Sequence, residues 1–162
     1  MTYSIVYSSR TGNTAMLARA LKEFLPEEDC VYFGEPSVQA LKADRIYAGF
    51  WTDKGSCDEA SAEFLKNLTG QEIFLFGTAG FGGAPAYFEQ ILSRVKANLA
   101  PQVRLIGSYM CQGKMPQSVR DRYLQMEDSP RRSTMLANFD AALNHPDMDD
   151  LNRLKAAVAG VK

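Results

Sequence analysis

Cysteine and histidine are scarce in this sequence of 162 residues. The three cysteines, Cys30, Cys57 and Cys111, are odd in number and far apart, so no zinc or dithiol spacing exists. We expect free thiols of the kind kept reduced in the cytoplasm, each a small buried hydrophobe. The only histidine, His145, precedes Pro146 in an expected turn, and we expect it at the surface. The sequence therefore predicts no metal site and no nucleophile–base pair.

Long hydrophobic runs and an excess of one charge are also absent. No apolar run approaches the roughly 20 residues that a membrane helix needs. No basic region precedes the short apolar stretch near Met1, so we expect neither a membrane span nor a signal peptide. The formal net charge of −1 gives no reason to expect binding to nucleic acid or to an anionic membrane. We expect one cytoplasmic domain over residues 1–162, which is an ordinary domain length.

What the sequence does contain is a set of short β-like runs separated by helical patterns. The runs cover residues 2–7, 30–33, 45–50, 72–77 and 103–110. The first, fourth and fifth are mostly continuous apolar stretches, which are typical of parallel strands covered on both faces. Apolar residues recur at helical spacing after Asn13 and over 60–68, 88–99 and 151–158, and we expect two or three short helices within 112–147. This alternation predicts an α/β fold, a parallel sheet with helices on both faces.

In such sheets ligands bind beyond the carboxyl ends of the strands, so the residues that follow each run are informative. The first run is followed by Ser9, Arg10, Thr11, Gly12, Asn13 and Thr14, which lead into a helix. Hydroxyl groups, a glycine and the free N–H groups of a helix start together make a neutral phosphate cradle. The same residues would also serve as a hydroxyl-rich N-cap without any ligand. Taken alone, the segment favours neither interpretation.

Aromatic residues and glycines follow the third and fourth runs. After the third run come Trp51, Thr52, Lys54 and Gly55. Trp51 would stack on a planar ligand or, alternatively, cap the end of the sheet. After the fourth run come Thr78, Ala79, Gly80, Phe81, Gly82 and Gly83, whose glycines expose backbone N–H and C=O groups. A phosphate cradle, a stacking ring and an amide-rich edge on one rim fit the cofactor FMN.

These residues resemble the flavodoxin family. Its phosphate fingerprint, T/S-x-T-G-x-T after the first strand, is matched by residues 9–14, and its two loop aromatics are matched by Trp51 and Phe81. The resemblance implies a three-layer sandwich around a five-stranded parallel sheet of order 2-1-3-4-5. It also implies phosphate ligands at Ser9, Thr11, Asn13 and Thr14, with backbone help from Arg10 and Gly12. Trp51 would then cover one face of the flavin, and the 52–55 and 78–83 loops would contact its edge.

The chain departs from the usual flavodoxin pattern in its charge. Electron-shuttle flavodoxins are strongly acidic as a rule, whereas this chain is nearly neutral, and Lys54 stands close to the expected edge of the flavin. The segment 50–65 is similar to a less studied group of flavodoxin-like proteins. We associate that group with a flavodoxin-like partner of bacterial bilirubin reductase.

The resemblance implies an FMN-binding electron-transfer protein that passes electrons transiently to a partner redox enzyme, as a monomer or weak dimer. The alternative is an FMN-dependent NAD(P)H or quinone reductase whose nicotinamide site comes from residues 112–147. A flavin-free signalling module is disfavoured, because the first and third strands do not end in acidic residues. Four arginines within 112–147 form either a docking surface or, as we favour, a solvated helix face: Arg120, Arg122, Arg131 and Arg132.

Overall fold

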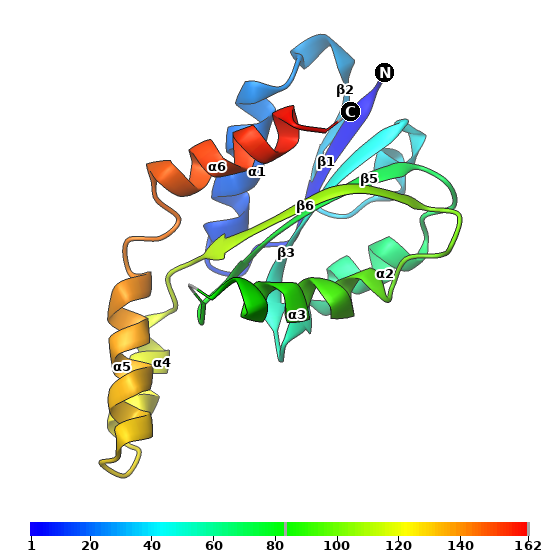
Figure 1. Ribbon diagram of the computed structural model, residues 1–162. Helices are drawn as coiled ribbons and strands as arrows, with labels where there is room; N and C mark the ends of the chain where they lie inside the picture. The colour runs from blue at the N-terminus through cyan, green and yellow to red at the C-terminus, as the bar shows by residue number, and fades with distance from the viewer. Residues whose placement is uncertain (83, 162) are drawn as a thin grey trace.

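A parallel β-sheet forms the centre of the molecule in the computed structural model, which describes residues 1–82 and 84–161. Its strands are β1 (Tyr3–Tyr7), β2 (Cys30–Gly34), β3 (Arg45–Asp53), β5 (Glu72–Ala79) and β6 (Arg104–Gln112). They are arranged in the order β2-β1-β3-β5-β6 (Figure 1). The fold and strand order predicted from the sequence are confirmed, with one addition. A two-residue strand, β4 (Ser56–Cys57), pairs antiparallel with the end of β3 and was too short to predict.

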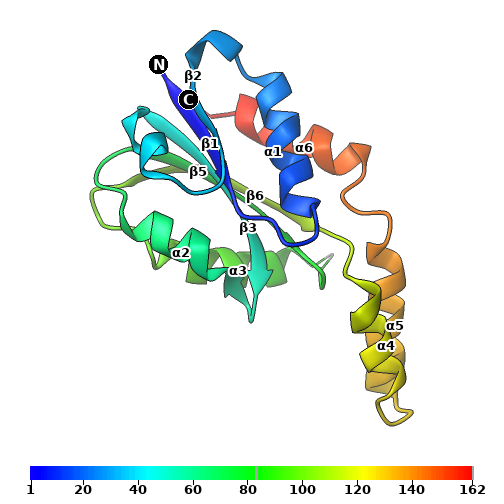
Figure 2. The same cartoon turned by 180° about the vertical axis from the view of Figure 1, so that it is seen from behind.

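Two helices cover each face of the sheet, so the molecule has three layers (Figures 1 and 2). One face carries α1 (Asn13–Phe24) and α6 (Met148–Ala159), and the other carries α2 (Glu59–Lys66) and α3 (Pro85–Lys96). Two short 3₁₀ helices, η1 (Glu27–Asp29) and η2 (Val38–Lys42), flank β2. Strand β5 contributes side chains to the hydrophobic layers on both faces of the sheet, because neighbouring side chains in a strand point in opposite directions. Phe74 and Phe76 pack toward α1 and α6, and Ile73 and Leu75 pack toward α2 and α3.

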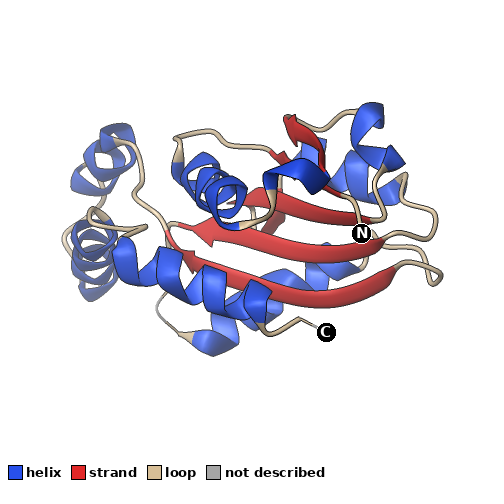
Figure 3. Cartoon of the chain, turned by 90° about the horizontal axis from the view of Figure 1, so that it is seen from above, coloured by secondary structure: helices blue, strands red, loops and turns tan. Residues whose placement is uncertain are grey.

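Two further helices lie outside the three layers. They are α4 (Gln117–Leu124) and α5 (Pro130–Ala142), in agreement with the expectation of two or three short helices in this region. They lie side by side beyond the carboxyl ends of the strands (Figures 1 and 3), and Arg120 Nε donates to Asp140 Oδ1 across them at 3.1 Å. We call residues 113–147 the helical hairpin. In the described part of the chain, no helix has both the length and the apolar character needed to cross a membrane.

Glycines in the central strands let large aromatic rings lie directly against the backbone. A Cβ atom built on Gly77 would lie 2.3 Å from Cζ of Phe50, and one built on Gly49 would lie 2.4 Å from Cε2 of Phe76. Both rings are almost fully buried. The C-terminal halves of β3 and β5 are therefore tightly packed as they approach the carboxyl edge of the sheet.

This packing predicts that Gly77→Ala lowers the free energy of unfolding by about 1–3 kcal/mol, because the Phe50 ring must move in a filled core. The matched control is Gly70→Ala, where a Cβ atom meets nothing within 4 Å. That change should alter stability by no more than about 0.5 kcal/mol. Urea titrations of both variants measure the difference, and equal stabilities would contradict the packing argument.

Candidate functional site

A cavity of about 730 Å³ opens at the carboxyl edge of the sheet. Its walls come from the turn before α1, the ends of β3 and β5, the segment that follows β5, and the helical hairpin. All of the site residues predicted from the sequence line this cavity except Gly12 and Gly82. Gly83 lies outside the described residues. The structure thus brings the predicted residues together, while their role as FMN ligands stays a prediction.

The turn before α1 leaves backbone N–H groups without partners. The N-cap residue Gly12 has φ 92° and offers no side-chain cap. The hydroxyl of Ser9 accepts from the N–H groups of Gly12 at 3.1 Å and Ala15 at 3.3 Å. The N–H groups of Asn13 and Thr14, at the first two helical positions, have no such partner among the described residues. A helix start of this kind favours an anion.

The side chain of Thr14 holds the cavity wall together and is not placed to bind a phosphate, contrary to the prediction from the sequence. Its side chain is fully buried, and its hydroxyl lies 3.0 Å from the carbonyl oxygen of Phe50 and 3.1 Å from Oγ1 of Thr78. The Thr14 hydroxyl donates to the Phe50 carbonyl and therefore has no proton left for a phosphate. What Thr14 can still offer to a ligand is its backbone N–H.

Asn13 links the same turn to the helical hairpin. Its side-chain amide donates to the carbonyl oxygen of Lys114 at 2.8 Å and to Oγ1 of Thr11 at 3.1 Å. The amide oxygen Oδ1 is buried and accepts no hydrogen bond from the described residues. A buried acceptor in this state costs about 1–3 kcal/mol unless a donor reaches it. A polar group bound at this turn would remove that cost.

Trp51 lies in strand β3 and not in the loop that the sequence predicted. The strand continues to Asp53 because Trp51 pairs with Thr78 of β5 and Thr52 pairs with Cys57 of β4. Polar residues at 52 and 53 gave no strand signal, which explains the error. The guanidinium carbon of Arg10 lies 5.5 Å from the centre of the Trp51 ring, within the range of a cation–π contact.

A tight turn at Lys54 and Gly55 joins β3 to β4 on the cavity wall. Lys54 has φ 51° and Gly55 has φ 81°, and two positive φ values are typical of the type I′ turn that fits a β-hairpin. Arg94 of α3 holds this turn from outside, since its Nη1 donates to the carbonyl oxygen of Gly55 at 3.0 Å. The turn is thus fixed from two sides, by the strand pair and by α3.

The hairpin and α3 also line the cavity, which the sequence did not predict. The additional lining residues are Tyr87, Gly113, Lys114, Met115, Pro116, Ser118, Val119 and Arg122. All but Tyr87 follow strand β6, which ends at the same rim as β1, β3 and β5. The rule that was applied to the other strand ends, that functional residues follow each strand, would have identified them.

Hydrogen bonds fix the hairpin to the cavity wall. The carbonyl oxygen of Gly80 accepts from the side-chain amides of Gln112 at 3.1 Å and Asn138 at 3.0 Å. The N–H of Gly113 donates to the carbonyl oxygen of Ala79 at 2.9 Å. A Cβ atom on Gly113 would lie within 2.5 Å of the Asn13 amide, so glycine is needed for this close approach. These contacts hold the hairpin against the loop that follows β5.

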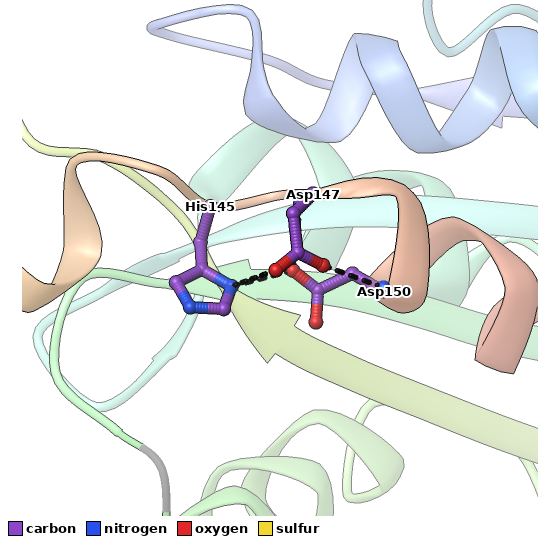
Figure 4. A group of neighbouring side chains, drawn as sticks. All are labelled: His145, Asp147 and Asp150. Carbon is purple, nitrogen blue, oxygen red and sulfur yellow. Dashed lines mark hydrogen bonds and ion pairs between the residues drawn. The ribbon is translucent and has the colours of Figure 1, made fainter.

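His145 is half-buried rather than at the surface as expected. Its side chain is 30% exposed, and Nδ1 lies 2.6 Å from Oδ2 of the buried Asp150 (Figure 4). Asp150 and Asp147 form a capping box that starts α6, and the hydrogen bond from the Asp150 N–H lowers the pKa of the Asp147 carboxyl. The backbone of His145 also accepts from the N–H of Lys114 at 2.9 Å. The residue therefore fixes the joint between the hairpin and α6.

The cysteines take no part in these contacts. Cys57 and Cys111 are buried as expected, whereas Cys30 is only half-buried, and all three thiols are free. Burial raises the pKa of the Cys57 and Cys111 thiols, which keeps them protonated and unreactive near neutral pH.

Comparison with known proteins defines the class to which this fold and site belong. A family model for the flavodoxin domain matches residues 4–159, so the chain belongs to the flavodoxin family. The family resemblance inferred from the sequence is thereby confirmed. The chain is 45% identical, over 172 aligned positions, to the flavodoxin-like domain-containing protein BilS of Clostridium symbiosum (strain WAL-14163). That alignment covers 93% of this chain and 90% of BilS.

Solved structures share the fold at low sequence identity. A short-chain flavodoxin associated with a non-canonical PDU bacterial microcompartment is 18% identical and superposes with a TM-score of 0.55. The match covers 88% of this chain and 96% of that flavodoxin. A flavoprotein from Lactobacillus acidophilus NCFM, solved in complex with FMN, is 15% identical with a TM-score of 0.51, and the match covers 67% and 92% of the two chains.

The buried Thr14 hydroxyl provides a test of how the cavity wall is held. Thr14→Val keeps the shape of the side chain but removes the buried hydroxyl that bonds to the Phe50 carbonyl and to Thr78. We expect the free energy of unfolding to fall by about 1–3 kcal/mol. Thr69→Val is the control, since Thr69 is exposed and its replacement should change stability by no more than about 0.5 kcal/mol. Chemical denaturation of the two variants distinguishes a buried structural hydroxyl from an exposed one.

Proposed function

We propose that this protein binds FMN in the cavity and carries electrons to a partner redox enzyme. The observation that supports this most directly is that Asn13 and Thr14 line the cavity at the start of α1, and that their N–H groups have no partner among the described residues. A phosphate monoester is the part of FMN that such a site would hold. The hydroxyl of Thr11 and the backbone of Arg10 flank the same turn.

The rest of the cavity suits a flat ring system. Trp51 lies on one wall, Phe81 and Tyr87 lie on the β5 and α3 side, and backbone groups of Gly55 and Gly80 edge the space. Aromatic side chains provide stacking faces, and backbone N–H and C=O groups provide edge contacts of fixed direction. When bound, FMN supplies one- and two-electron redox chemistry through its ring, while the protein sets its exposure and its electrostatic environment.

A carrier needs a redox partner, and the resemblance of segment 50–65 suggests one. The segment 50–65 is similar to the group that we associate with bacterial bilirubin reductase, and the chain is 45% identical to a BilS protein. We therefore propose a bilirubin reductase as the first partner to test. The protein would present the exposed edge of its cofactor at the mouth of the cavity and release the partner after each transfer.

The first experiment tests whether the helix start holds the phosphate. Calorimetry of the cofactor-free protein should show FMN binding with a dissociation constant in the micromolar range or below. Riboflavin, which lacks the phosphate, should bind at least about 100-fold more weakly, because two hydrogen bonds to a charged group are each worth about 1.5–3 kcal/mol. Equal affinities for the two flavins, or no uptake of FMN, would refute the proposal.

A matched pair of variants tests the conformation of the turn. Gly12 has φ 92°, which L side chains rarely adopt, whereas a Cβ atom on Gly70 meets nothing within 4 Å. Gly12→Val should therefore displace the N–H groups that follow it from the phosphate. We expect FMN to bind about 10–100-fold more weakly to Gly12→Val than to Gly70→Ala, whereas riboflavin should bind equally to both. Circular dichroism confirms that both variants fold.

A further inference from the structure

The charged residues that line the cavity all carry the same sign. They are Arg10, Lys54, Lys114 and Arg122, and all four are exposed. In the described part of the chain, no Asp or Glu lines the cavity. The whole chain has 18 basic and 19 acidic residues, with a formal net charge of −1. The mouth of the cavity is therefore a local concentration of positive charge on a nearly neutral protein.

Neighbouring carboxylates do not neutralise these four cations. None of the four forms an ion pair within 4.0 Å with a described residue, whereas Arg45, Arg104, Arg120 and Arg153 each do. Three acids occur nearby in the sequence: Asp53, Asp58 and Asp121. Asp58 caps α2 through the N–H of Ser61, and Asp121 accepts from Gln117 on its own helix.

The helical hairpin holds two of the cations at the mouth. The backbone of Lys114 is fixed from both sides, by the Asn13 amide at 2.8 Å and by the His145 carbonyl at 2.9 Å. Arg122 lies on α4, which is tied to α5 by the Arg120–Asp140 ion pair at 3.1 Å. Helix α5 in turn is tied to the cavity wall by Asn138. The backbone at Lys114 and Arg122 is therefore held in place.

The four arginines of the hairpin consequently have different environments. Arg120 is paired with Asp140, Arg132 donates to the carbonyl oxygen of Met126 at 3.2 Å, and Arg131 is exposed. Only Arg122 among them lines the cavity. The solvated-face interpretation favoured from the sequence fits Arg131, and the docking interpretation fits Arg122.

Apolar side chains line the cavity together with the cations. Phe81 is 38% exposed, and Met115 and Val119 of the hairpin are half-buried. An exposed aromatic residue with arginine and lysine around it has the composition of a protein interface, in which an apolar centre is surrounded by a polar rim. The mouth of the cavity thus combines exposed apolar surface, mainly Phe81, with basic side chains.

We infer that the mouth docks a protein surface that carries carboxylates around an apolar patch, so that this carrier presents positive charge to an acidic electron-transfer partner. The inference deepens the proposed function and rests on it. Opposite charges at two docking surfaces raise the rate of encounter by about 10–1000-fold at low salt and align the partners. The cations would place the partner over the cavity, where the exposed edge of the cofactor lies.

Redox-inert hexacyanocobaltate(III), a compact trianion, tests the charge at the mouth directly. Added to the ¹⁵N-labelled, FMN-loaded protein, it should shift the amide signals of residues around 10, 54, 114 and 122 more than those elsewhere. The double variant Lys114→Glu/Arg122→Glu should abolish these shifts. The control Arg19→Glu/Lys66→Glu changes two exposed basic residues outside the cavity by the same net charge and should retain them. Shifts that are spread evenly over the surface would overturn the inference.

Electron transfer to small complexes of opposite charge provides the second test. The reduced holoprotein passes two electrons to two hexacyanoferrate(III) anions, which become hexacyanoferrate(II), or to two hexaammineruthenium(III) cations, which become ruthenium(II), and the flavin protons go to solvent. At an ionic strength of about 10 mM, where screening is weak, we expect Lys114→Glu/Arg122→Glu to slow the anion reaction about tenfold and to speed the cation reaction. The control variant should leave both rates near those of the wild type.

The two proposals fail in different ways. A protein that takes up no FMN refutes the proposed function, while the cobalt titration of the cofactor-free chain still reports on the mouth. A protein that binds FMN but reacts with both complexes at rates independent of Lys114 and Arg122 refutes only the acidic partner.

Discussion

The cavity depends on one buried hydroxyl group at which three elements of the fold meet. Thr14 at the start of α1 contacts the Phe50 carbonyl of β3 and the Thr78 hydroxyl of β5. Because the group is shielded from water, its removal breaks two buried hydrogen bonds in the core. The interaction joins the start of α1 to both strands, whose ends form the cavity wall together with the turn before α1.

Much of the fold could be predicted because the sheet is buried on both faces. Continuous apolar runs such as Ile73–Phe76 fit few structures other than a buried parallel strand, and the helices between them follow from the 3.6-residue period. The ends of the strands could not be placed as well. Trp51, Thr52 and Asp53 extend β3 by pairing with distant residues, and no hydrophobic pattern records that pairing.

Most residues of the site could be predicted from the sequence, but the hydrogen bonds that join them could not. The fingerprint at residues 9–14 identified the turn, but the partner of the Thr14 hydroxyl lies 36 residues away and could not be read from local sequence. The packing of the hairpin against the cavity is the larger feature that the sequence did not predict. Its helices are short and mostly exposed, so their pattern does not say where they pack, and the contacts from Asn13 and Asn138 that fix them are side-chain amides without periodicity.

The place of the hairpin in the chain has an evolutionary consequence. It leaves the sheet after β6 and returns at α6, and it contacts the remainder of the protein mainly at the rim (Figure 1). Its length and surface can diverge without repacking either hydrophobic layer, because α6 begins again with its own capping box. A scaffold of this design can change about a fifth of its residues while the turn before α1 and the ends of β3 and β5 keep theirs.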